Sequence, residues 1–219
     1  MRNRSLLFTL LCIAFPAALA TAQFRQDPMA EKILREVGSR YKKLQGFQAE
    51  FSHESQTNQG ETMASRNGNI LVSGSRYRLK TGSSTLFCDG KTVWTADSKS
   101  KEVSIADYEP EPDDITPERV YTFYQKGYKY IFIGEVKVKG MVWQTIDLEP
   151  ENIRKEVAKI RLFVDKKSLE IKKWIVFERG SNDREEFVVK KFNRLSRSPG
   201  KEIGFEKKDF PGYRMVDLR

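Results

Sequence analysis

The sequence predicts a mainly β protein of the α+β class, built as one continuous antiparallel sheet with two helical segments. Apolar residues recur at three- and four-residue spacing in one long stretch, over residues 27–46. After Gly46 the apolar period is two, and turn-forming residues interrupt it repeatedly, as in an up-and-down meander. Because no internal repeat or linker divides the chain, we expect one domain over residues 23–219.

Residues 1–22 are typical of a cleaved secretory signal peptide. Arg2 and Arg4 precede an apolar run that Pro16 interrupts, and a small-x-small cleavage pattern ends at Ala22. A membrane anchor is the alternative, but about 20 apolar residues in a row are needed to cross a bilayer. We therefore expect export with cleavage near Ala22.

An amphipathic helix should open the mature domain. Asp27 can cap its start, Pro28 suits its first turn, and Gly46 ends it. Its apolar stripe consists of Met29, Ile33, Val37, Tyr41 and Leu44. Charged residues occupy the other side, so the stripe must be buried against another apolar layer.

Short strands follow this helix. Phe47, Ala49 and Phe51 alternate with polar residues, as in a strand with one wet face. The Asp89-Gly90 dipeptide predicts a hairpin turn. Further strands of this first meander are predicted over residues 69–72, 76–80, 85–88, 92–95 and 102–105.

An acidic loop over residues 108–114 then interrupts the meander, because its prolines do not suit a central strand. A second, short helix is predicted from Pro117 to Lys126, with Val120, Phe123 and Tyr124 on one face. The strands of a second meander are predicted over residues 130–133, 136–138, 141–148, 159–164, 169–177 and 186–192.

The positive charge does not indicate a nucleic-acid partner. The formal net charge is +9, but lysines and arginines are spread along the chain rather than gathered into one tract. Since the protein is expected to be exported, we interpret the excess as solvated strand faces, with a patch for anionic lipid headgroups as the alternative.

Few residues could form a catalytic or metal site. His53 is the only histidine, which excludes two-histidine zinc sites, and no Gly-x-Ser-x-Gly elbow is present. We predict no catalytic residue, no metal and no cofactor, and we interpret His53 as a surface residue on the wet face beside Ser52. Acidic pairs such as Glu109/Glu111 leave a two-carboxylate glycosidase open. Cys88 lies in an apolar run, which favours a small buried side chain over a reactive thiol.

Aromatic residues are dense between positions 121 and 132. The three tryptophans, Trp94, Trp143 and Trp174, lie on separate predicted strands. A helix over a curved sheet can bury such side chains in an ordinary core or leave a cavity between the two layers. Composition leaves both alternatives open.

An ordered set of short motifs extends through most of the mature chain. An F-x-A-x-F strand spans residues 47–51, and residues 68–72 are similar to a G-x-L-x-V strand, with Ile70 at the leucine position. An aromatic strand follows at 77–79, then a D-G-K-T-x-W hairpin at 89–94. Residues 205–217 form a C-terminal pattern with Pro211, Gly212 and a final Asp217. In this order the motifs resemble those of the periplasmic outer-membrane lipoprotein carrier protein (LolA) family.

The resemblance implies an incomplete antiparallel β-barrel, a strongly curved sheet with a helical lid over an apolar cavity. It also implies a monomeric periplasmic carrier, not an enzyme, that binds the acyl chains of lipoproteins. Its partners would be acylated lipoproteins, an inner-membrane ABC transporter that loads it and an outer-membrane acceptor. The implied cavity or lid residues are Leu71, Tyr77, Leu79, Trp94, Val120, Phe123, Tyr124, Phe132, Trp143 and Trp174.

One departure concerns the lid. The family usually carries an Arg-Pro pair after the G-x-L-x-V strand, and that arginine is thought to latch the lid. Here Ser73-Gly74-Ser75 follows, so the latch is missing, moved to Arg76 or supplied elsewhere. Two other functions stay open: a lipid-binding envelope sensor or scaffold with the same fold, and a small exported hydrolase.

Overall fold

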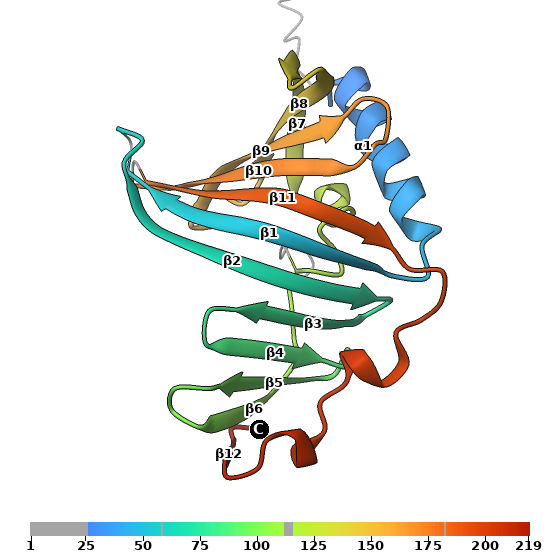
Figure 1. Ribbon diagram of the computed structural model, residues 1–219. Helices are drawn as coiled ribbons and strands as arrows, with labels where there is room; N and C mark the ends of the chain where they lie inside the picture. Colours follow the sequence, from blue (N-terminus) through green and yellow to red (C-terminus); the bar gives the residue numbers. More distant parts are fainter. Residues whose placement is uncertain (1–25, 58, 112–115, 182) are drawn as a thin grey trace, which may run out of the picture.

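The computed structural model describes residues 26–57, 59–111, 116–181 and 183–219. The predicted signal peptide lies outside these residues. Within them, one α-helix, α1 (Pro28–Lys42), packs across the inner side of a curved sheet (Figure 1). The described chain is thus mainly β, as predicted, with one α-helix rather than the two helical segments that the sequence indicated.

The sheet has twelve strands in the described part of the chain. The strands of the first half are β1 (Phe47–Gln56), β2 (Thr62–Ser73), β3 (Arg76–Thr81), β4 (Ser84–Cys88), β5 (Thr92–Asp97) and β6 (Glu102–Asp107). Those of the second half are β7 (Tyr128–Val138), β8 (Met141–Pro150), β9 (Val157–Asp165), β10 (Ile171–Glu178), β11 (Arg184–Arg194) and β12 (Arg214–Asp217). Short 3₁₀ helices are η1 (Phe123–Gln125), η2 (Gly200–Ile203) and η3 (Lys207–Asp209).

The strand order is β12-β6-β5-β4-β3-β2-β1-β11-β10-β9-β8-β7. Two meanders, β1 to β6 and β7 to β11, are joined where β1 pairs with β11. The outermost strands, β7 and β12, do not pair with each other, so the barrel is incomplete, as predicted. The parallel pairing of β12 with β6 was not predicted.

Helix α1 is fixed at its start by Asp27. One carboxylate oxygen accepts hydrogen bonds from the backbone N–H of Met29 (2.8 Å) and Ala30 (3.3 Å). The other accepts from the N–H of Phe132 on β7 (3.0 Å), and this bond is the largest cause that lowers the pKa of Asp27. A single side chain therefore caps the helix and ties it to the sheet. Met29, predicted to lie in the buried stripe, is 50% exposed.

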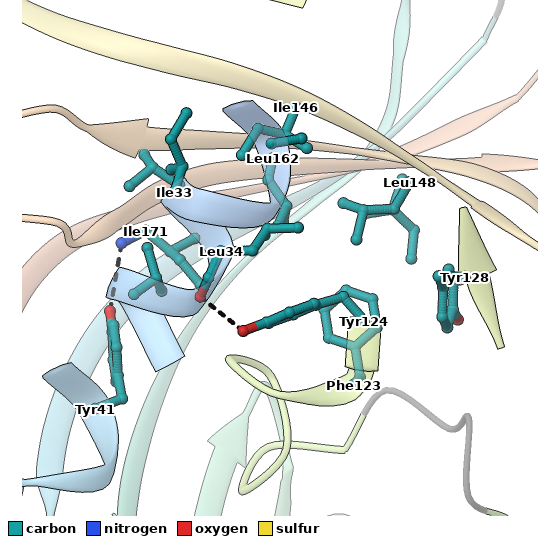
Figure 2. Packing of buried hydrophobic residues seen from close by; sticks show 14 of the residues in the cluster. Ile33, Leu34, Tyr41, Phe123, Tyr124, Tyr128, Ile146, Leu148, Leu162 and Ile171 are labelled. Carbon is teal, nitrogen blue, oxygen red and sulfur yellow. Dashed lines mark hydrogen bonds between the residues drawn. The ribbon is translucent and has the colours of Figure 1, made fainter. Parts of the chain in front are cut away.

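The core lies between α1, the sheet and the segment that precedes β7 (Figure 2). Leu34 and Val37 of the helix are buried, and the Tyr124 hydroxyl donates a 2.7 Å hydrogen bond to the Leu34 carbonyl. Gly38 permits this approach, because a Cβ there would lie 3.0 Å from the Tyr124 hydroxyl oxygen. The segment is thereby held against the helix.

The predicted second helix, from Pro117 to Lys126, is wrong as an α-helix. The structure has turns followed by the 3₁₀ helix η1. Its bonds mostly join residues three apart, as from Arg119 N to the Thr116 carbonyl and from Thr122 N to the Arg119 carbonyl. A segment this short gains little from helix propagation, so the packing of its aromatic side chains decides its path.

We expect Asp27→Ala to destabilise the protein by about 1 kcal/mol or more, since it removes a helix cap and the bond to Phe132. Asp27→Asn keeps an acceptor oxygen and should cost less. Because the native pKa of Asp27 is lowered, its contribution to stability is present at neutral pH and is lost as the pH falls through that pKa. Urea denaturation at several pH values measures both effects. Equal stability of wild type and Asp27→Ala at pH 7 would contradict the assignment.

Candidate functional site

An apolar hollow of about 300 Å³ lies on the concave side of the sheet. Its size is at the lower end of the range for small-molecule sites. Among the described side chains that line it, only those of Tyr41, Thr116 and Trp174 carry a polar atom. The lining residues are Tyr41, Phe47, Ala49, Phe51, Ile70, Leu79, Thr116, Pro117, Val120, Ile171, Trp174, Val176, Phe187, Val189 and Phe192.

Two β-bulges determine which side chains enter the hollow. In β11 the pairing with β1 shifts so that Val189 and Phe192 both line it, although they are three residues apart. In β10 a shift against β9 does the same for Ile171 and Trp174. Strict alternation would have placed one member of each pair on the outer face, so the bulges add two large side chains to the hollow.

Gly68 makes room for one wall. It pairs with Phe51 across β1 and β2, and a Cβ at Gly68 would overlap Cζ of the Phe51 ring. The ring therefore lies over the glycine backbone. This contact gives a physical reason for glycine at the start of the 68–72 motif.

Helix α1 lines one end of the hollow with Tyr41. Its ring stacks on Tyr121 (4.7 Å between centroids) and meets Phe192 edge-on (5.5 Å). Its hydroxyl oxygen accepts a hydrogen bond from the backbone N–H of Ile171 (3.3 Å). Burial raises the pKa of Tyr41, so the hydroxyl stays neutral and this end of the hollow carries no charge.

The cover segment (residues 116–122) lies over the hollow and is tied to the sheet by a buried carboxylate. Glu118, whose side chain is 9% exposed, accepts hydrogen bonds from the hydroxyls of Tyr108 and Thr116, both at 2.6 Å. Its other oxygen, Oε2, is buried and has no hydrogen-bond partner among the described residues. Burial and the nearby carboxylate raise the pKa of Tyr108, so its hydroxyl keeps the proton that it donates. Arg76, the predicted latch, instead donates to the Ser198 hydroxyl at 3.3 Å.

The structure divides the ten predicted cavity or lid residues into three groups. Those that line the hollow are Leu79, Val120 and Trp174. Those that belong to or pack against the surrounding core are Tyr77, Phe123, Tyr124 and Phe132. Those that face the other side of the sheet are Leu71, Trp94 and Trp143.

The third group corrects the prediction. Leu71 follows Ile70, which lines the hollow, so its side chain points to the opposite face. Trp94 stacks on Phe205 at 5.4 Å, under the C-terminal segment that crosses the outer face. Trp143 meets Phe163 at 6.4 Å on the outer face of β8 and β9. Apolar side chains cover parts of both faces, so apolar character alone could not identify the inner one.

The sequence prediction missed most of the floor of the hollow. Phe187, Val189 and Phe192 on β11 and Phe51 on β1 were not named as site residues. For Phe51 a signal was present, because the alternation from Phe47 to Phe51 assigns these side chains to one face. For β11 the bulge hides the shared face.

His53 does not lie on the face predicted for it. Its ring stacks on Phe187 (4.3 Å between centroids, 4° between planes), so it lies on the inner face two residues beyond Phe51. Ser52, predicted to be wet, is buried. Cys88 is buried as predicted, and burial raises the pKa of its thiol.

Within the described residues, no group of three or more His, Cys, Asp or Glu side chains could hold a metal ion. No helix in the described part of the chain is both long and apolar enough to cross a membrane.

Comparison with known proteins supports one family. The model of the outer membrane lipoprotein carrier protein LolA matches residues 42–197. No curated protein sequence matches the chain. An uncharacterized conserved protein from Thermus thermophilus has a similar structure (TM-score 0.55, 11% identity, 85% of this chain and 98% of the other).

Two further solved structures are less similar. One is a LolA superfamily protein from Nitrosomonas europaea (TM-score 0.44, 9% identity, 82% of this chain and 98% of the other). The other is the Mycobacterium tuberculosis lipoprotein LppX (TM-score 0.47, 9% identity, 78% of this chain and 99% of the other). At these identities the likeness concerns the fold alone.

We expect Gly68→Ala to destabilise the protein by about 1–3 kcal/mol, because the added methyl group overlaps the Phe51 ring. Phe51→Leu in the same chain should recover part of the loss, which a double-mutant cycle in urea would measure. Gly204→Ala is the matched control, since its Cβ would meet only an ordinary contact at 3.7 Å. Equal losses at Gly68 and Gly204 would refute the role of this contact.

Proposed function

Because the chain belongs to the outer membrane lipoprotein carrier protein LolA family, as the match over residues 42–197 shows, we propose that it carries lipoproteins and holds their acyl chains in the apolar hollow. The observation that carries this proposal is the lining itself. Among the described residues, α1, five strands and the cover segment all contribute aliphatic or aromatic side chains to this lining.

The physical requirement is shelter from water. Each methylene group of an acyl chain is worth about 0.8 kcal/mol when it is buried, so a carrier must supply an apolar surface of matching extent. The hollow of about 300 Å³, lined from Tyr41 to Phe187, offers an apolar surface of this kind. The side chains of this lining suit contact with hydrocarbon rather than proton transfer, and we propose that the protein acts by binding.

To release its ligand, the protein must bind the acyl chains not much more tightly than the membrane does. We propose that the cover segment provides this balance, since Thr116, Pro117 and Val120 contact the hollow and can exchange those contacts for contacts with an acyl chain. The anchor at its far end is stronger, because Phe123 and Tyr124 are core residues. The segment would therefore move at residues 116–120 and stay fixed at η1.

The cellular setting belongs to the same proposal. A monomeric carrier in the periplasm would receive acylated lipoproteins from an inner-membrane ABC transporter and deliver them to an outer-membrane acceptor. The mature single domain would comprise residues 23–219. The positively charged start, the interrupted apolar run and the cleavage pattern at Ala22 support export.

We expect Val189→Phe to fill the hollow and to weaken binding of a palmitoylated peptide. Val188→Phe is the matched control, because the neighbouring residue faces the outer side of the same strand. The peptide should raise the melting temperature of wild type and Val188→Phe, as a ligand of the native state does, and should raise that of Val189→Phe much less. Each shift is measured against the same variant without peptide, with a non-acylated peptide as the blank. Equal shifts in both variants would count against the hollow as the acyl site.

N-terminal sequencing of the protein from the cell envelope should give Gln23 as the first residue. Cleavage after Ala22 follows from the small-x-small pattern. Protein recovered from membranes with Met1 intact would contradict export in this form.

A further inference from the structure

A second, polar recess of about 360 Å³ adjoins the hollow on the inner face of the sheet. Its lining residues are His53, Ser55, Ala64, Arg66, Glu178, Glu185 and Phe187. Phe187 also lines the hollow, so the two spaces share one wall. A single elongated ligand could therefore occupy both.

The shared wall is a stack of three rings. Phe187 on β11 lies between His53 on β1 (4.3 Å, 4° between planes) and Trp174 on β10 (4.9 Å, 9°). Trp174 belongs to the hollow and His53 to the recess. The three stacked rings therefore mark the boundary between the apolar hollow and the polar recess.

The basic and the acidic side chains of the recess lie on different strands. The basic side chains, Arg66 and His53, are register partners on β2 and β1. The acidic side chains, Glu185 and Glu178, lie on β11 and β10. The recess is therefore dipolar, with the Arg66 guanidinium on one pair of strands and the two acidic side chains on the adjacent pair.

The centre of the recess is held in place. The Glu185 carboxylate accepts a hydrogen bond from the Ser55 hydroxyl (2.6 Å) and contacts the His53 ring nitrogen Nε2. The side chains of His53 and Glu185 are each about one-quarter exposed. This network fixes the imidazole over Phe187 and leaves Arg66 and Glu178 on the two rims.

The rim charges have no partner within the described part of the chain. Neither Arg66 nor Glu178 forms an ion pair there, and both side chains are exposed. Their strands are three strand spacings apart, which is about 14 Å between backbones. Both side chains line the same recess, so a ligand bound between them can contact both.

We propose that the recess binds the zwitterionic phosphate–amine headgroup of a lipid whose acyl chain lies in the hollow. The proposal rests on the proposed function for the chain part of the ligand and names a further ligand class. The phosphate would lie toward Arg66 and His53, and the ammonium toward Glu185 and Glu178. A net anionic head would meet two carboxylates, and an uncharged head would gain nothing from the two rim charges. The chain terminus would point toward Tyr41.

Three probes with the same palmitoyl chain test the headgroup. They are lysophosphatidylethanolamine, lysophosphatidylglycerol and monopalmitoylglycerol, titrated below micelle-forming concentrations by calorimetry. We expect the zwitterionic probe to bind wild type most tightly. Arg66→Gln and Glu178→Gln should each weaken it by about fivefold and leave monopalmitoylglycerol unchanged. Arg154→Gln and Glu149→Gln, which remove exposed charges outside the recess lining, are the matched controls.

The outcomes separate this proposal from the proposed function. If the three probes bind equally, or if the rim variants behave like the controls, the headgroup site is refuted while the hollow remains. If lysophosphatidylglycerol binds most tightly, the recess is not a zwitterion site. If no palmitoyl probe binds wild type, both proposals fail. Loss of monopalmitoylglycerol binding in Val189→Phe alone would support the hollow independently of the recess.

The orientation of the ligand gives a second readout. In a Trp94→Phe/Trp143→Phe protein, Trp174 is the remaining tryptophan, and it stacks on the shared wall. A bromine atom on the acyl chain near the headgroup should quench its emission more than a bromine at the chain terminus. Stronger quenching by the terminal bromine would place the head at the Tyr41 end and overturn the proposal.

Discussion

The structure depends on the burial of the concave apolar face of an open sheet. A closed barrel would cover this face with its own strands, but here β7 and β12 do not meet. Helix α1 and residues 116–128 supply the missing layer, and the Tyr124–Leu34 hydrogen bond joins these two parts. Because the added layer covers the face incompletely between Tyr41 and Phe187, the same constraint that organises the core also leaves the hollow.

The cover segment (residues 116–122) and the 3₁₀ helix η1 that follows it differ in how tightly they are packed. Residues around η1 are packed in the core, where removal of a large side chain is costly. The preceding turns are held by the stacking of Tyr121 on Tyr41 and by the buried Glu118 carboxylate, whose second oxygen has no partner among the described residues. An unsatisfied buried acceptor costs free energy, so this end of the cover is less stable than its hydrogen bonds alone suggest. A binding surface that must open and close needs such a contrast.

Local sequence patterns predicted most of the strands and the first helix, but they did not predict which face of the sheet each side chain occupies. Asp27, Pro28 and the Asp89-Gly90 turn act through their immediate neighbours, and each lies where the sequence placed it. Trp94 and Trp174 both lie on predicted strands, yet only one enters the hollow. The difference depends on strand register and on bulges such as that in β11, which come from pairing between distant segments. The parallel pairing of β12 and the position of His53 over Phe187 depend on the same long-range register.

The pairing of β1 with β11 has a consequence for the order in which the protein folds. The two meanders consist of neighbouring hairpins and can form locally, but Phe47 pairs with Arg194, near the opposite end of the described chain. The entropy of closing so long a loop must be lost before this pairing contributes, which makes it a slow step. Since β1 and β11 together form the floor of the hollow, the binding surface is completed only after residues beyond 190 have emerged and docked. A nascent or truncated chain that ends before β11 therefore exposes half of an apolar floor and cannot yet hold a ligand.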